Sequence, residues 1–306
     1  MAKLRKVRDE LLGRAGASAT GRAYAGDWES FISWCKAAGR AALPASAESV
    51  ELYLVHEAQR GQRLYTLRRR LTGIRAAHRA AGAKPPGSAG ALKLLRELAR
   101  DGKGRPSPKR ALTVDVLGQM VRELDVRDPR GKRDRAILLL GFAAGLRRSE
   151  LSGLDLADVR LDRRGVELTI RRSKTDQEGR GRTVAVWSAK QRALCPVLAV
   201  RAWIEARGRW AGPLFTRWRG ETETRERLSG DSVNDIVQRA ASDAGLDGSA
   251  FGAHSLRAGC VTAAVKAGAP LPAIMARTGH RSIATLSGYY RPATAWSAGD
   301  PLAGAL

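Results

Sequence analysis

Side chains that can act on a phosphate occur close together near the C-terminus of the sequence. His254 and Arg257 are three residues apart, so on a helix they would point the same way. His280 opens a second polar segment, and Tyr289 follows it by nine residues. A tyrosine can serve as a nucleophile, and arginine can bind phosphate oxygens in paired geometry. Residues 253–291 therefore suggest chemistry on a phosphate group.

Further charged groups precede this stretch, beside segments that should be buried. A strongly apolar helix is expected over residues 133–144, and Gly145 permits a tight turn after it. Arg147 then lies at the end of a buried helix, where a charge is costly unless it has partners or a role. Glu150 follows three residues later on a new helix, from which it could hold that arginine in place.

A β-hairpin is expected next, because β-branched residues alternate over residues 166–170 and 183–187. The glycine-containing residues 171–182 join the two strands and carry Lys174 near the end of the first one. The other elements expected in this half are a helix capped by Thr113, a chain break at Asp128 and Pro129, helices over 196–207 and 230–244, and a short strand over 213–216.

A separate helical unit is expected in the first third of the chain. Apolar residues at helical spacing predict four helices, at residues 20–38, after the cap Ser46, at 65–81 and at 88–101. The run DGKGRPSPKR has the composition of a linker. The predicted divisions are a flexible basic arm at 1–18, a helical domain at 19–105, a second domain at 106–293 and a tail at 294–306.

The third helix of the first domain has an arginine-rich surface. Leu67, Leu71 and Ile74 form its apolar side, which His78 borders as a core-edge residue. An arginine-rich helix suits phosphate contacts or a major groove, and a solvated face explains the pattern equally well. The candidate DNA-binding residues are Arg68, Arg69, Arg70, Arg75 and Arg79.

The charge balance indicates a polyanionic partner. The sequence has 54 Lys and Arg against 30 Asp and Glu, which gives a net charge of +24 and a pI near 11.1. Residues 1–105 contribute 21 basic and 9 acidic side chains, so half of the excess lies there and half in the remainder. Nucleic acid is the first candidate and an anionic membrane the second, and both halves of the chain should contact the partner.

Cysteine and apolar patterns favour a cytoplasmic location. Cys35, Cys195 and Cys260 are scattered, which is typical of buried thiols in a reducing compartment. No apolar run approaches the length of a membrane span, and the N-terminus lacks an apolar signal segment. A zinc site from His254, His280 and Cys260 would not match the usual ligand spacings.

Five motifs in order resemble those of the tyrosine recombinases, or phage integrase family. They are GLRRSEL, a lysine on a β-hairpin, HSLR, GH, and a tyrosine nine residues after that histidine. The segments TGRAYAGDWESFISWCKAAG, LPAS and TLRRRLTGIRAAHRAAG look like the core-binding domain of these enzymes. Xer recombinases usually carry a second histidine where Ala258 stands, so the resemblance favours Cre-type and mobile-element integrases over Xer proteins.

The resemblance implies a fold that is mostly α-helical with a small β-sheet in the second domain. The first domain would be an all-α, SAM-like core-binding domain and the second a mixed α+β catalytic domain. Together they would form a C-shaped clamp around double-stranded DNA. No metal or other cofactor is implied, because side chains supply the positive charge.

The resemblance also implies catalytic roles. Tyr289 would form a 3′-phosphotyrosine intermediate, and Arg147 and Arg257 would stabilise the charge that develops on the phosphate. Lys174 would protonate the leaving 5′ oxygen, and His254 would take the tyrosine proton or bind a phosphate oxygen. Two further roles are a hydrogen bond donated by His280 and support of the site by Glu150.

The implied function is site-specific recombination at inverted-repeat half-sites. Four protomers would assemble on two DNA sites, and the free protein would be a monomer or weak dimer. The tail could pack onto a neighbouring protomer. Two alternatives remain open, a catalytically silent DNA-binding protein of the same fold and a type IB topoisomerase-like enzyme. Tyr290, adjacent to Tyr289, is the alternative nucleophile.

Overall fold

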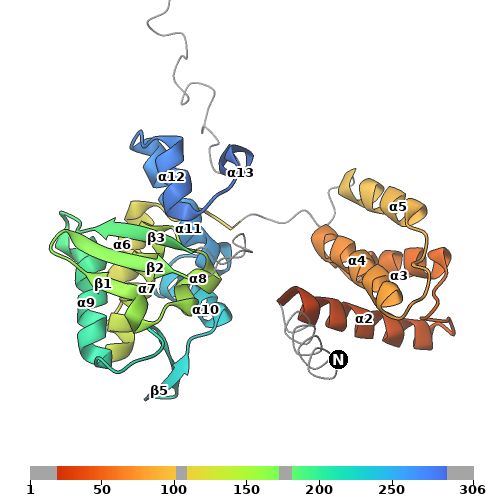
Figure 1. The fold of residues 1–306 in the computed structure, drawn as a ribbon, viewed down its shortest axis with the longest axis horizontal. Coiled ribbons are helices and arrows are strands. Elements are labelled where there is room, and N and C mark those ends of the chain that lie inside the picture. The colour runs from red at the N-terminus through yellow and green to blue at the C-terminus, as the bar shows by residue number, and fades with distance from the viewer. Residues whose placement is uncertain (1–18, 101–108, 172–180, 288–306) are drawn as a thin grey trace, which may run out of the picture. The chain divides into compact units, whose positions relative to one another are not determined.

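A computed structural model describes residues 19–100, 109–171 and 181–287 of the chain (Figure 1). The chain divides into two compact units, Met1–Pro108 and Lys109–Leu306. The domain boundary expected at residue 105 lies outside the described residues, as do the basic arm, the C-terminal tail, Lys174, Tyr289 and Tyr290.

The described part of the first unit is helical. Ser46 caps the second helix, because its side chain accepts a hydrogen bond from the backbone N–H of Ser49 at 3.1 Å. Phe31, Tyr53 and Ile74 lie fully buried between the helices. The four helices are α2 (Ala19–Ala37), α3 (Ala47–Gln59), α4 (Leu64–Ala80) and α5 (Ala89–Arg100), and each begins within one residue of its expected start.

His78 is a fully buried residue of this unit rather than one at the core edge. Its Nδ1 donates to the carbonyl of Ile74 at 2.8 Å, so Nε2 is free of a proton in the neutral ring and accepts from the backbone N–H of Ala45 at 2.9 Å. Both ring nitrogens are therefore satisfied by the backbone, as a buried histidine requires.

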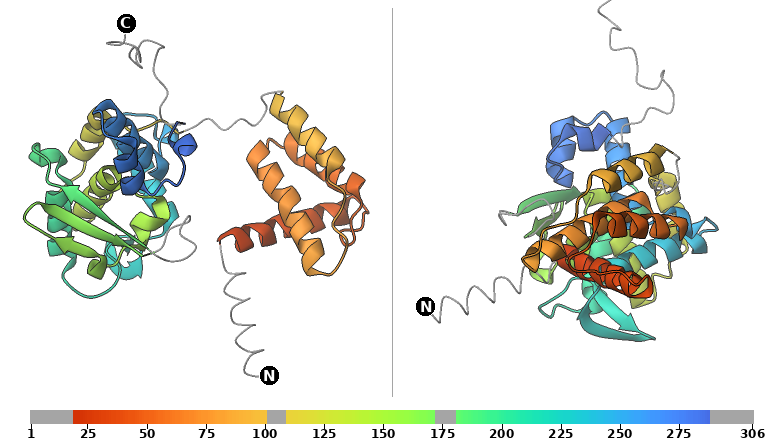
Figure 2. Two further views of the ribbon diagram at one scale, coloured as in Figure 1. Left: turned by 45° about the horizontal axis from the view of Figure 1, so that its top comes forward. Right: turned by 90° about the vertical axis from the view of Figure 1, so that its right-hand side faces the viewer.

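The second unit packs helices against a three-stranded antiparallel sheet and also contains a two-stranded antiparallel sheet that projects from it (Figures 1 and 2). Helix α7 lies at its centre, in contact with α9, α11 and the strand β3. The helices are α6 (Val114–Arg122), α7 (Pro129–Ala144), α8 (Arg148–Gly153), α9 (Pro196–Arg207), α10 (Gly230–Asp243), α11 (Ala253–Lys266), α12 (Leu271–Thr278) and α13 (Ile283–Ser287). The strands are β1 (Val159–Leu161), β2 (Gly165–Ile170), β3 (Arg182–Trp187), β4 (Thr216–Arg219) and β5 (Thr222–Arg227).

The first sheet has the strand order β1-β2-β3. Within it Val166 pairs with Val186 and Leu168 with Val184, and these four side chains are buried on the same face. Arg182 is on that inward face too, because it is two residues before Val184. The hairpin predicted from alternation is confirmed, and its two strands place Arg182 at the end of the sheet.

The sequence interpretation was wrong at two places in this unit. Asp128 and Pro129 were expected to break the chain, but they start α7: the Asp128 carboxylate accepts from the backbone N–H of Arg130 at 3.0 Å, and Pro129 occupies the first helical position. A strand was expected over residues 213–216, whereas the chain forms the hairpin β4–β5 from Thr216 onward.

Candidate active site and arginine-rich helix

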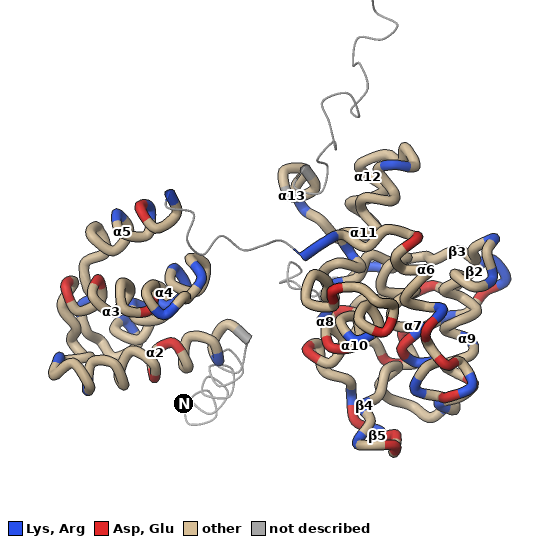
Figure 3. Tube along the Cα trace, turned by 180° about the vertical axis from the view of Figure 1, so that it is seen from behind, with Lys and Arg blue, Asp and Glu red and all other residues tan. Residues whose placement is uncertain are grey.

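The arginines of α4 differ in the partners that they contact, and Figure 3 shows basic residues in blue along this helix. Arg69 donates to both carboxylate oxygens of Asp27, at 2.8 and 2.9 Å. Arg70 is paired with Glu57 and donates to the hydroxyl of Tyr53 at 2.6 Å. These two guanidiniums hold α4 against its neighbours, so contact with DNA is not needed to explain them.

The other three candidates of α4 differ from that pair. Arg75 is half-buried and donates to the carbonyl of Pro86. Arg68 and Arg79 are exposed, and within the described residues neither forms an ion pair. Arg68 and Arg79 are thus the candidates on α4 that remain available to an external anion.

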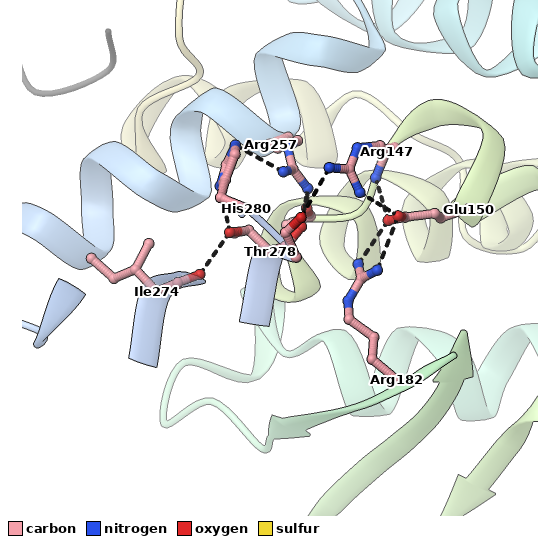
Figure 4. Close-up of polar contacts among 9 residues, drawn as sticks. Arg147, Glu150, Arg182, Arg257, Ile274, Thr278 and His280 are labelled. Carbon is pink, nitrogen blue, oxygen red and sulfur yellow. Dashed lines mark hydrogen bonds and ion pairs between the residues drawn. The ribbon is translucent and has the colours of Figure 1, made fainter. Parts of the chain in front are cut away.

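Arg147 is positioned by the turn that joins α7 to α8. Gly145 ends α7 with φ +61°, a left-handed conformation that suits glycine. Glu150 then accepts the backbone N–H of Arg147 at 2.9 Å and its Nη1 at 2.8 Å (Figure 4). Nη2 of Arg147 donates to the carbonyl of Gly279 at 3.0 Å, which links α8 to the end of α12.

Arg182 is a member of the site that the sequence interpretation missed. Its Nη1 and Nη2 donate to the two carboxylate oxygens of Glu150, at 3.0 and 2.8 Å (Figure 4). The strand was expected over residues 183–187, and continuing its alternation back by one residue puts Arg182 on the same face as Val184. An inward-facing charge needs a partner, and that requirement was the available signal.

Glu150 is ionised in this environment. Burial alone would raise the pKa of its carboxyl, but the hydrogen bonds from Arg182 and from the backbone and side chain of Arg147 lower that pKa to about 2. A carboxylate with this pKa carries no proton to donate at neutral pH. The geometry supports a role in holding the two arginines.

Arg257 is buried on α11, where it is 3% exposed. Its Nη1 donates to the carbonyls of Gly145 and Thr278, at 2.8 and 2.5 Å, and its Nη2 lies 2.8 Å from Nε2 of His280. These contacts tie the guanidinium to the C-terminal ends of both α7 and α12. A buried arginine gains stability from such carbonyl acceptors.

The two histidines of the site differ in exposure. His280 is 8% exposed, and its pKa is lowered to about 4, first by burial and then by the charge of Arg257. His254 lies exposed in the first turn of α11; its pKa is also lowered, first by desolvation and then by Arg257. Both rings are therefore neutral at pH 7.

Four of the predicted residues converge on one pocket of about 400 Å³. It is lined by Arg147, His254, Arg257 and His280, together with Leu146, Arg148, Asn234 and Ala253. In the sequence, Lys174 falls between β2 and β3, and Tyr289 comes two residues after α13 ends. Both of these predicted residues lie outside the described residues.

The described part of the chain contains neither a metal-binding cluster nor a membrane-spanning helix. There, no cluster of three or more His, Cys, Asp or Glu side chains is arranged to hold a metal ion. Its helices are also all too short or too polar to cross a membrane.

The second unit matches the model of a known protein family. The model of the phage integrase family matches residues 110–295, which is more than half of the sequence and includes every predicted catalytic residue. The chain belongs to the phage integrase family. The resemblance inferred from GLRRSEL, HSLR and GH is confirmed, and with it the interpretation as a tyrosine recombinase.

Curated relatives in this family carry Xer names. An integrase/recombinase xerD homolog of Selenomonas ruminantium is 34% identical over 278 residues, which are 89% of this chain and 81% of that protein. The tyrosine recombinase XerD of Bifidobacterium longum is 30% identical over 285 residues, which are 90% of this chain and 87% of that protein. The expectation of a closer resemblance to Cre-type integrases than to Xer proteins is therefore not supported.

Solved structures confirm the fold class. A lambda integrase dimer bound to a COC′ core site has a TM-score of 0.61 and 18% identity, and covers 94% of this chain and 75% of its own. The Tn1549 transposon integrase in complex with transposon right end DNA has a TM-score of 0.58 and 17% identity, with 83% of each chain covered. The predicted fold, mostly helical with small antiparallel sheets, is that of these proteins.

Proposed function

We propose that this member of the phage integrase family cleaves and rejoins DNA at specific sites through a phosphotyrosine at Tyr289. The observation that supports the proposal most strongly is the convergence of Arg147, Arg257, His254 and His280 on one pocket. The motif spacing adds Tyr289 and Lys174 to this site.

Two of the arginines that line the pocket, Arg147 and Arg257, account for binding of the phosphate. When a nucleophile attacks a phosphodiester, negative charge gathers on the non-bridging oxygens, and fixed guanidiniums stabilise it. Arg147 is held by Glu150, and Arg257 by the carbonyls of Gly145 and Thr278, so neither needs to reorganise during the reaction. Loss of one such donor costs about 3 kcal/mol of barrier, which is roughly a hundredfold in rate.

The proton transfers follow from the states of the side chains. The oxygen of Tyr289 attacks phosphorus, the bond to the 5′ oxygen breaks, and a 5′-hydroxyl leaves. His254 is neutral at pH 7 and can accept the tyrosine proton, while Lys174 supplies the proton to the leaving oxygen. Rejoining is the reverse step, in which a 5′-hydroxyl of the partner strand displaces the tyrosine.

The partner in this proposal is double-stranded DNA with inverted-repeat half-sites. The net charge of +24 supports a large electrostatic share of the binding. The helical unit would contact one side of the duplex through Arg68 and Arg79, and the second unit the other side, as a C-shaped clamp. Four protomers would assemble on two sites in the cytoplasm, with residues 294–306 on a neighbouring protomer.

A recombination assay tests the function. The full chain first selects its binding sequence from a pool of random duplexes, and two copies of that sequence are then placed on separate DNA molecules of different length. We expect recombinant products of predictable length, and none with Arg257→Ala. Binding without cleavage would identify a silent DNA-binding protein. Relaxation of supercoiled plasmid without exchange would identify a topoisomerase.

A further inference from the structure

Thr278 is a fully buried residue at the end of α12, with two separate links to Arg257. Its carbonyl accepts from Nη1 of Arg257 at 2.5 Å. Its hydroxyl lies 2.6 Å from Nδ1 of His280, and Nε2 of the same ring lies 2.8 Å from Nη2 of Arg257. The three residues therefore form a closed loop of hydrogen bonds (Figure 4).

The direction of each hydrogen bond in this loop can be deduced. The Thr278 hydroxyl lies 2.6 Å from the carbonyl of Ile274, which can only accept, so its single proton points there. It must then accept from Nδ1 of His280, which places the ring proton on Nδ1. A neutral ring has only one such proton, so Nε2 presents a lone pair and accepts from Arg257.

This deduction changes the expected role of His280. The family resemblance implied that His280 donates a hydrogen bond. In this structure Nε2 is the acceptor of a hydrogen bond from Arg257, so a donor role would require the ring to gain a proton. Among the described residues, the charged and titratable groups that act on the ring are Arg257 and His254 of α11, Arg147 before α8 and Arg182 of β3, and all four disfavour that proton.

We propose that Thr278 is a positioning residue whose hydroxyl fixes His280 as the Nδ1-protonated tautomer and thereby orients the guanidinium of Arg257. Thr278 touches no reacting atom and acts through His280. Its effect on DNA cleavage rests on the proposed function, whereas its effect on the tautomer does not.

A common alternative is that the Thr278 hydroxyl only bonds back to the helix. Thr262 on α11 provides a matched control for that alternative, because its hydroxyl donates to the carbonyl four residues earlier, Ala258, at 2.9 Å. It forms the same local bond without a histidine. A purely local role would give the two threonines equivalent effects on substitution to valine.

The test reads the imidazole nitrogens of the full chain by long-range ¹H–¹⁵N spectroscopy at pH 7. The sequence has only four histidines, and a His280→Gln variant assigns the signals of interest. We expect a proton on Nδ1 of His280 in the parent, in Thr278→Ser and in Thr262→Val. In Thr278→Val we expect a mixture of tautomers or the Nε2-protonated form.

Two results would overturn the proposal. One is an Nε2-protonated His280 in the parent, which requires no variant and so does not depend on the folding of Thr278→Val. The other is an unchanged, pure Nδ1-protonated ring in a folded Thr278→Val protein.

Cleavage of a selected DNA site provides a second readout. We expect Thr278→Val to slow it about tenfold, the effect of about one hydrogen bond, with Thr278→Ser and Thr262→Val close to the parent. Equal rates in Thr278→Val and the parent would contradict the positioning role. A parent that cleaves no site would refute the proposed function, and the tautomer measurement would still decide the role of Thr278.

Discussion

Arg182 of β3 and Glu150 of α8 form a two-point ion pair, with the two guanidinium nitrogens 3.0 and 2.8 Å from the two carboxylate oxygens. The same carboxylate holds Arg147 through the backbone and the side chain. The base of the β2–β3 hairpin is thus connected to a pocket arginine through a single buried acid. In the sequence, Arg182 follows the segment that contains Lys174, the general acid of the proposed reaction.

Removal of Arg182 should weaken both stability and cleavage. In Arg182→Ala the buried Glu150 keeps only Arg147 as a partner, so we expect a loss of about 2 kcal/mol in the free energy of unfolding. Cleavage should fall at least tenfold, because Arg147 is less well held. Arg160→Ala is the control on the same sheet, since its pair with Glu167 is exposed, and it should leave both quantities unchanged. Equal effects of the two variants in urea unfolding and cleavage assays would contradict this role.

The ionised Glu150 should make stability depend on pH in a defined window. Its pKa is about 2 in the folded protein against 4.5 ordinarily, so its contribution is complete above pH 4.5 and is lost as the pH falls toward 2. The full contribution is about 3 kcal/mol. The difference in unfolding free energy between the parent and Glu150→Gln should therefore shrink by about 2 kcal/mol between pH 6 and pH 3. A difference that stays constant with pH would mean that Glu150 is not held as a carboxylate.

Gly279 should be required for the site as well as for the chain turn. It has φ +67°, and a Cβ there would lie 3.0 Å from Nη1 of Arg182. Gly268 has φ +72° and open space around it. In both alanine variants the free energy of unfolding should fall by about 1 kcal/mol, because alanine is strained in the left-handed backbone conformation. Only Gly279→Ala should also slow cleavage, and a similar slowing by Gly268→Ala would show that backbone strain alone is responsible.

Arg68 and Arg79 should contribute to DNA affinity through phosphates. Each alanine variant should weaken binding to all sequences alike and reduce the slope of log affinity against log salt by about one. The measurement is a salt series of binding isotherms on a selected site. Arg100→Ala is the control, because Arg100 is exposed in the same unit but paired with Glu97. If the slope of log affinity against log salt is unchanged in both variants, this face of α4 does not contact DNA.

The residues of the site were predictable from sequence to different degrees. Arg147 stands out because it follows an apolar helix that must be buried, and Arg257 because it shares a helical face with His254. The structure places both at one pocket. Arg182 was missed because the expected strand began at residue 183, which left this arginine in the joining segment, whereas β3 begins at Arg182 and continues the alternation of Val184 and Val186. Asp128 and Pro129 were interpreted as a break because aspartate and proline are common in turns. The same two residue types are also favoured at the start of a helix, which is where they occur here.

Other parts of the fold gave weaker signals. The β4–β5 hairpin has polar residues on both faces, so no alternation marks it, and its pairing depends on the surrounding unit. On α4, sequence spacing could not distinguish Arg69 from the exposed Arg68. Arg69 pairs with Asp27 of α2, which is far from it in the sequence. The preference for Cre-type relatives relied largely on Ala258, and one position carried less information than similarity along the whole chain.

The central claim, a phosphotyrosine at Tyr289, is tested most directly with a suicide substrate. The duplex carries the selected site with a nick that lets the short cleaved strand diffuse away, and the full chain is incubated with it in EDTA. We expect a covalent protein–DNA adduct whose peptide map places the 3′ phosphate on Tyr289. The adduct should be lost in Tyr289→Phe and kept in Tyr290→Phe. The absence of any adduct with the parent protein, or an adduct on Tyr290, would contradict the account.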